Sequence, residues 1–232
     1  HSYIRFWDLR YFYSPNFNFK SPYVPDYLLC TSNGQLNEMI ESGFPKDKLR
    51  LVESLRYNWI DRTDLQSISQ TKILISGDYK FVNNKNLISM LFYDIEPYNK
   101  DFKFFFLPHP SSSIKKIARI LPDEVTIIHR DEINIDNINL AIVSNLSAAC
   151  IDYKILGIPT LYHYSKLSLN MSPFRLTNAC NSFTNKTELK SYLNQISKKT
   201  FKNIDLPDDF LQINKKLILW SKEIFEFNKQ RL

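Results

Sequence analysis

Short apolar runs alternate with helix-length segments along the chain from about residue 27 onward. Several runs are apolar at consecutive positions, which is typical of strands that are buried on both faces of a parallel sheet. The predicted strands are residues 27–32, 49–54, 72–77, 102–108, 125–129, 140–145 and 159–164. The predicted helices between them are residues 35–42, 85–93, 113–121 and 146–156. This alternation predicts an α/β fold with a doubly wound parallel sheet and right-handed crossovers.

Two further helices are predicted near the C-terminus, at residues 191–196 and 213–230. The second has apolar residues at three- and four-residue spacing, which gives it an apolar face that must pack against another part of the protein. Residues 61–70 are polar and resemble a linker. We therefore expect three parts: an N-terminal segment over residues 1–70, an α/β domain over residues 71–208, and a C-terminal helix over residues 209–232 that packs back toward the N-terminal segment.

Composition narrows the class of protein. The chain has 232 residues, of which 44% are hydrophobic, so it holds one large domain or one domain and part of another. No apolar run approaches the ~20 residues that span a bilayer, and the N-terminus has no signal-peptide core. It also lacks an initiator Met and reads as a shortened chain. Three widely spaced cysteines favour reduced thiols in a cytoplasmic protein and argue against structural zinc.

The formal net charge of +6 suits a polyanionic partner, but the basic residues are scattered and not gathered into a stripe. An ordinary basic surface explains the charge best. The scatter argues against nucleic-acid binding, whereas contact with an anionic inner-membrane surface fits the charge equally well.

In open α/β sheets, ligands bind at the carboxyl ends of the strands, so polar residues there are candidate site residues. Gly77 follows the strand at 72–77 in the sequence SGDY, where its backbone could approach a ligand and Ser76 and Asp78 supply polar atoms. An ordinary turn is the alternative. His109 lies between two prolines in LPHPSSSIKK, before serines that could cap the next helix. A phosphate contact and a structural histidine are both open readings of it.

The third candidate stretch is SNLSAAC, residues 144–150. Ser144 and Ser147 bracket a predicted helix start, where hydroxyls and backbone N–H groups can bind phosphate. A plain N-cap by Ser144 or Asn145 is the alternative. Asp152 falls within an apolar flank of the same helix, so its carboxylate needs a partner. That partner is either a protein group, such as Lys154, or a ligand diol such as ribose.

Several nucleotide-binding and catalytic motifs are absent from the sequence: GxGxxG, the Walker lysine motif, HExxH and GxSxG. The chain has only four glycines, which excludes a glycine-rich phosphate loop.

The segment SNLSAACIDYKILGIPTLYHY is similar to the donor-binding segment of GT-B glycosyltransferases. In that superfamily a serine or glycine pair opens a helix, and an acidic residue, a glycine and a proline follow, as Asp152, Gly157 and Pro159 do here. With the HP pair at His109, the pattern resembles bacterial surface-carbohydrate enzymes that use CMP-sugar or CDP-glycerol donors. The N-terminal stretch resembles the end of their acceptor-side domain.

The resemblance implies a Rossmann-like donor-binding domain with part of an N-terminal domain. It implies donor-phosphate contacts by His109, Ser144, Ser147 and Gly77 and a ribose contact by Asp152. It also implies a catalytic role for His1, as the base or in contact with the acceptor. The implied activity is metal-free, cofactor-free transfer of a sugar, such as a CMP-activated ulosonic acid, to a surface polysaccharide or lipid-linked glycan.

The first two-thirds or so of a usual acceptor domain is not in this sequence, so a catalytic acid or base from that part cannot be named. The chain alone is expected to bind a donor without turning it over. Two alternatives stay open: a non-catalytic nucleotide-sugar-binding or partner-docking domain, and a nucleotide-sugar epimerase of the same architecture.

Overall fold

The structure, a computed structural model, describes residues 16–19, 24–58, 70–93, 102–129, 132, 137–166, 169–174, 179–207 and 210–229. His1 and most of the predicted linker at 61–70 lie outside these residues. The chain divides into two compact units, one of His1–Ile60 with Pro207–Leu232 and the other of Asp61–Leu206. Each unit is described by itself.

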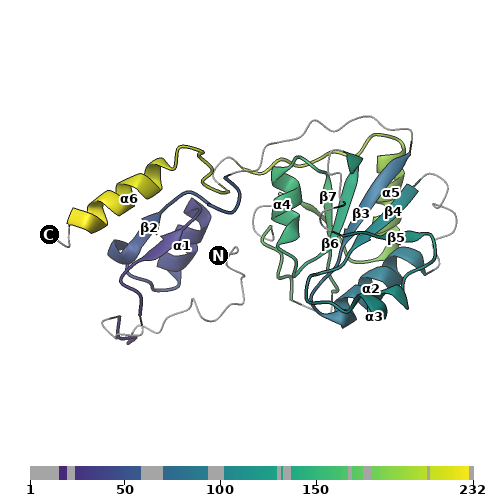
Figure 1. Cartoon of the computed structure of the whole chain (residues 1–232), viewed down its shortest axis with the longest axis horizontal. Helices are drawn as coiled ribbons and strands as arrows, with labels where there is room; N and C mark the ends of the chain where they lie inside the picture. Colours follow the sequence, from purple (N-terminus) through teal and green to yellow (C-terminus); the bar gives the residue numbers. More distant parts are fainter. Residues whose placement is uncertain are drawn as a thin grey trace. The chain divides into compact units, whose positions relative to one another are not determined.

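The unit of Asp61–Leu206 is built on a six-stranded parallel sheet with the order β5-β4-β3-β6-β7-β8 (Figure 1). Its strands are β3 (Thr71–Ser76), β4 (Phe102–Leu107), β5 (Val125–Ile127), β6 (Leu140–Ser144), β7 (Thr160–His163) and β8 (Asn181–Phe183). From β3 the chain builds outward through β4 to β5, then returns to the other side of β3 with β6. The strand order therefore reverses between β3 and β6, and the predicted doubly wound sheet is confirmed.

The helices of this unit are α2 (Phe81–Phe92), α3 (Ile114–Ala118), α4 (Ala149–Ile155) and α5 (Lys186–Ser197). The main core lies on one face of the sheet, where side chains from α2, α3 and α5 bury strand residues such as Ile75, Ile142 and Leu161. Helix α4 packs on β6 and β7, and its residues are absent from that core. Because side chains alternate between the faces of a strand, Ser144 and His163 lie on the same face as Ile142 and Leu161.

Glycine ends α4 as predicted. Gly157 has φ 83°, a left-handed conformation that glycine adopts without strain. The amide of the next residue, Ile158, donates back to the carbonyl of Tyr153 at 2.9 Å. This arrangement satisfies a carbonyl at the helix end and turns the chain into β7.

The unit of His1–Ile60 and Pro207–Leu232 contains a parallel pair, β1 (Leu28–Cys30) and β2 (Leu49–Leu51). Between them lie α1 (Asn33–Glu41) and a short 3-10 helix, η2 (Lys46–Lys48), and the unit ends with α6 (Ile218–Lys229). Ser32 caps α1, because its hydroxyl accepts a hydrogen bond from the Gln35 amide at 3.0 Å.

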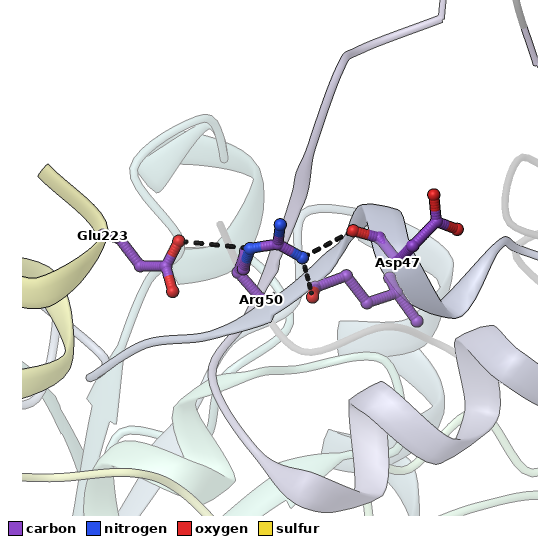
Figure 2. A network of polar contacts seen from close by, with 4 residues as sticks. Asp47, Arg50 and Glu223 are labelled. Carbon is purple, nitrogen blue, oxygen red and sulfur yellow. Dashed lines mark hydrogen bonds and ion pairs between the residues drawn. The ribbon is translucent and has the colours of Figure 1, made fainter. Parts of the chain in front are cut away.

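Two side chains bind α6: Arg50 of β2 and Glu53, which follows β2. The buried Glu53 carboxylate accepts hydrogen bonds from the amides of Leu219, at 2.7 Å, and Trp220, at 3.0 Å. These amides belong to the first turn of α6, where a carboxylate is favoured. The Arg50 guanidinium lies between Glu223, with Nε 3.4 Å from Oε2, and the carbonyl of Asp47 (Figure 2). None of the helices in the described ranges is long and apolar enough to cross a membrane.

Candidate functional site

The reversal between β3 and β6 brings Asp78 and Ser144 together. Ser144 ends β6, one residue beyond the last β3–β6 pair, which joins Ser76 to Val143. Its hydroxyl donates a hydrogen bond to Oδ2 of Asp78, two residues past β3. Both side chains are buried, with 2% of Asp78 and 4% of Ser144 exposed. A carboxylate is therefore held at the carboxyl edge of the sheet, where ligands bind in this fold class.

The loop that carries Asp78 is fixed by further hydrogen bonds. The buried Asn84 side chain, on α2, accepts from the Asp78 amide at 2.6 Å and donates to the Asp78 carbonyl at 2.8 Å. Ser112 donates its hydroxyl to the same carbonyl at 3.1 Å, and Oδ1 of Asp78 accepts from the Lys80 amide at 2.9 Å. Asp78 thus joins β3, α2, the loop after β4, and β6. The sequence showed Asp78 only as one polar residue in a turn. It gave no means of identifying Asn84, Ser112 and Ser144 as its partners.

Gly77 is explained by protein packing. Its amide donates a hydrogen bond to the Leu107 carbonyl at 2.8 Å, so this N–H already has an acceptor within the protein. A Cβ at this position would lie 3.1 Å from the Leu107 carbonyl oxygen and 3.2 Å from the His109 amide nitrogen. Close approach between the ends of β3 and β4 therefore accounts for a glycine at this position, and the predicted ligand contact of Gly77 stays a prediction.

His109 follows β4 and is exposed beside this loop. Its Nδ1 accepts a hydrogen bond from the Ser111 amide at 3.2 Å and lies 2.8 Å from the Ser111 hydroxyl. Because a backbone N–H can only donate, the neutral ring carries its proton on Nε2, which is a donor. The Tyr79 ring is 6.2 Å from the His109 ring, and the Lys80 ammonium is 5.6 Å from the Tyr79 ring. The exposed imidazole thus has an aromatic neighbour, and a cationic group lies beside that aromatic ring.

The start of α4 differs from the prediction. The helix begins at Ala149, and the residue at its N-cap position, Ala148, forms no side-chain cap hydrogen bond. The predicted cap by Ser144 or Asn145 is therefore wrong, because Ser144 binds Asp78 and Asn145 donates to the Leu169 carbonyl at 2.9 Å. Ser147 is half-buried, and its oxygen accepts from the Ala149 amide at 3.3 Å. Its hydroxyl proton is not used in that bond. The serines after β4 cap nothing either, since Ser113 precedes α3 without a side-chain bond.

Asp152 is half-buried on α4. The residues that α4 buries are Cys150, Ile151, Tyr153 and Lys154, whereas the apolar flank predicted around Asp152 is only partly covered. Asp152 therefore lies on the less buried side of the helix, although its Oδ1 is enclosed. Lys154, weighed as a partner for it, directs its ammonium to the Ile204 carbonyl and to Oδ1 of Asn203, at 2.9 Å.

His163 ends β7 and is paired in register with Ser144 on β6. Its ring lies 5.2 Å from the Phe183 ring, and 9% of the residue is exposed. Burial lowers the pKa of the imidazole, so the ring is neutral at pH 7. Across the described ranges, no group of three His, Cys, Asp or Glu side chains is placed to hold a metal ion.

Comparisons with known proteins identify the fold. No protein-family model matches the chain, and no curated protein sequence matches it. Solved structures do resemble it. S. aureus MnaA, in a co-structure with UDP, has a TM-score of 0.59 and 11% identity over 90% of this chain and 60% of that chain.

Methanocaldococcus jannaschii UDP-GlcNAc 2-epimerase, in complex with UDP-GlcNAc and UDP, has a TM-score of 0.57 and 15% identity over 87% of this chain and 61% of that chain. Anabaena HepE, in complex with UDP-glucose, has a TM-score of 0.50 and 10% identity over 90% and 65%.

At this identity the likeness concerns the fold alone, and the chain spans less than two thirds of each of these proteins. The chain therefore has a GT-B-type architecture, with a Rossmann-like unit and part of a second unit.

Proposed function

We propose that the carboxyl edge of the sheet around β3 and β6 binds a pyrimidine nucleotide sugar, and that the chain is the donor-binding part of a GT-B-type glycosyltransferase. The observation that carries the proposal is the Asp78–Ser144 hydrogen bond at the reversal of strand order, with His109 exposed beside it. Ligands of doubly wound folds bind in this crevice. The three solved structures named above contain UDP or UDP-sugars, which supports a nucleotide-sugar ligand.

The donor phosphates are proposed to bind on the side of β4. His109 has an Nε2–H donor that faces away from Ser111. The Tyr79 ring, which lies beside His109, also lies near the Lys80 ammonium. Both favour an anion. The Ser147 hydroxyl supplies another donor. These donors would stabilise the charge that develops on the leaving phosphate during transfer, without a metal or another cofactor.

Ser144 is assigned a different part in this proposal than the phosphate contact implied by the sequence resemblance. Its proton is directed to Asp78, and the Asp78 carboxylate disfavours a phosphate at the same point. Hydroxyl groups of the ligand suit the surroundings of Asp78 better, because a carboxylate accepts their hydrogen bonds. The nucleotide sugar would therefore place its phosphates near His109 and a hydroxyl-bearing part near Ser144.

Asp152 stays the proposed ribose contact. It lies on α4, the helix that follows β6, and it is half-buried with an enclosed Oδ1. A ribose diol offers two hydroxyl donors to such a carboxylate, as in dinucleotide-binding folds. The implied glycan or lipid-linked acceptor, the contact with the inner membrane surface and the cytoplasmic location belong to the same proposal.

A nucleotide-sugar epimerase is the second candidate function. It is favoured by the resemblance to the Methanocaldococcus jannaschii 2-epimerase. The two candidates share the nucleotide site and differ in the fate of the sugar. NMR of UDP-GlcNAc incubated with the full-length protein separates them: an epimerase gives a 2-epimer, whereas a transferase gives sugar release or transfer.

Calorimetric titration with CMP, CDP and UDP tests the shared site. We expect the wild-type chain to bind at least one of them, and His109→Ala and Asp152→Ala to lose about tenfold or more in affinity, since each removes a charge-assisted hydrogen bond. His129→Ala and Asp123→Ala change exposed residues away from the β3–β6 reversal and serve as controls. If none of the nucleotides binds at millimolar concentration, the proposed function fails for this chain.

A further inference from the structure

His163 is largely buried, but its ring nitrogens are not enclosed. Only 9% of the residue is exposed, and no hydrogen bond to the protein holds either ring nitrogen within the described part of the chain. Neither nitrogen is among the fully enclosed side-chain atoms that lack a hydrogen bond, so the ring keeps some contact with solvent. The ring packs against Phe183 at 5.2 Å, which fixes its position and leaves its nitrogens able to bind a ligand.

The place of His163 in the sheet shows where a partner would approach. It is the last residue of β7, so it lies at the carboxyl edge of the sheet. It is the register partner of Ser144, whose hydroxyl binds Asp78. Neighbouring strands are about 4.8 Å apart, and paired residues of parallel strands share a face. His163 therefore lies one strand from the Asp78–Ser144 pair, on the same face of the sheet.

We propose that His163 contacts the ligand of this edge and hydrogen-bonds a hydroxyl group of the transferred sugar. The inference rests on the proposed nucleotide-sugar site and names a specificity-determining residue within it. A neutral imidazole offers one donor and one acceptor, and a hydroxyl group offers the same two functions in return. A phosphate would prefer the cationic side of the site around Lys80 and His109.

The transferred sugar is a better partner for His163 than the ribose is, because His163 and Asp152 lie on opposite faces of the sheet. Asp152, the proposed ribose contact, is on α4, which packs on β6 and β7 without joining the core of the other face. His163 lies on that other face with Leu161 and Phe183. One ribose would have to reach both faces at once, whereas a nucleotide sugar presents separate hydroxyl groups to each.

Comparison of UDP with UDP-GlcNAc tests the assignment, because they differ by the sugar. In His163→Phe, which keeps the ring packing on Phe183, we expect the affinity for UDP-GlcNAc to fall about tenfold and the affinity for UDP to change less than about twofold. His163→Gln, which keeps a donor and an acceptor, should recover part of the loss. His129→Phe, an exposed histidine after β5, is the matched control. Thermal midpoints of all variants establish that they are folded.

Each outcome decides between two claims. Equal losses for UDP and UDP-GlcNAc would place the contact on the nucleotide and overturn the sugar assignment, and no change in either would remove His163 from the site. Wild-type protein that binds neither would overturn both.

Discussion

The Ser144 hydroxyl donates a hydrogen bond to the Asp78 carboxylate, and this bond joins β6 to the loop after β3 where the strand order reverses. Both residues are almost completely buried. A buried carboxylate is costly unless hydrogen bonds satisfy it. The pair is therefore expected to stabilise the fold as well as to form part of a candidate site.

Ser144→Ala should therefore destabilise the protein. The change leaves Oδ2 of Asp78 without this donor in a buried position, and we expect the free energy of unfolding to fall by about 1–3 kcal/mol. Urea denaturation at pH 7 measures it. Ser147→Ala removes a half-buried hydroxyl that accepts one bond at 3.3 Å, and it should cost less. Equal losses in the two variants would contradict the importance given to the Asp78 contact.

Asn84 should contribute as much to the free energy of unfolding as Ser144 does. Its side-chain amide makes two hydrogen bonds to the Asp78 backbone, and Asn84→Ala would leave a buried N–H and a buried carbonyl without them. We expect a loss of about 2 kcal/mol in the free energy of unfolding. Asn86→Ala, an exposed change on the same helix, should stay within about 0.5 kcal/mol of the wild type. Helix propensity alone favours alanine over asparagine, so a loss in Asn86→Ala as large as that in Asn84→Ala would contradict the importance given to the Asp78 contact.

Glu53 predicts a pH dependence of stability. Burial alone would raise the pKa of its carboxyl, but hydrogen bonds from backbone amides, those of Leu219 and Trp220 foremost, together outweigh burial and hold the pKa below its usual value of 4.5. A lowered pKa means that the ionised form stabilises the fold. This contribution is complete above about pH 4.5 and is lost as the pH falls through the folded-state pKa.

Glu53→Gln should reduce the free energy of unfolding by about 1–3 kcal/mol at pH 7. It should also flatten the loss of stability in acid. Urea denaturation between pH 7 and pH 3 measures both effects. The control is Glu41→Gln, an exposed change at the end of α1. The account of α6 would be contradicted if Glu53→Gln kept the acid profile of the wild type.

The three cysteines should react slowly in the native protein. All are buried, and burial raises the pKa of Cys30 to about 11 and that of Cys180 to about 12, with Cys150 raised as well. At pH 8 only about one Cys180 thiol in ten thousand is then a thiolate, and the thiolate is the reactive form. With a thiol-reactive dye, we expect all three to react at least a hundredfold faster in denaturant. A thiol that reacts in the native state at the denatured rate would contradict the burial of that cysteine.

Long apolar runs predicted the central strands, and Gly157 predicted the end of α4. The strands at 72–77, 102–108 and 140–145 coincide with β3, β4 and β6 to within a residue or two, because buried parallel strands read as continuous apolar runs. Strand β8 was not predicted. It has three residues, two of them polar, and it pairs with β7 alone, so its periodicity carries no signal.

The site was less accessible to sequence reasoning. Asp78 was noted as a polar residue in a turn, but its importance depends on Ser144, 66 residues away, and on Asn84 from α2. Such partners become visible only when the strand order is known. The helix wheel around Asp152 also misjudged which side of α4 is buried, because Lys154 directs its ammonium into the protein to bind Asn203 and Ile204.

Backbone amide shifts during titration of the wild-type chain with UDP and with CMP test the central claim most directly, because they report where a nucleotide binds. The account predicts the largest shifts at the carboxyl edge of the sheet, in residues 78–80, 109–112 and 144–147. Shifts that are absent at millimolar nucleotide, or that cluster at the amino ends of the strands around Thr71, Phe102 and Leu140, would contradict it.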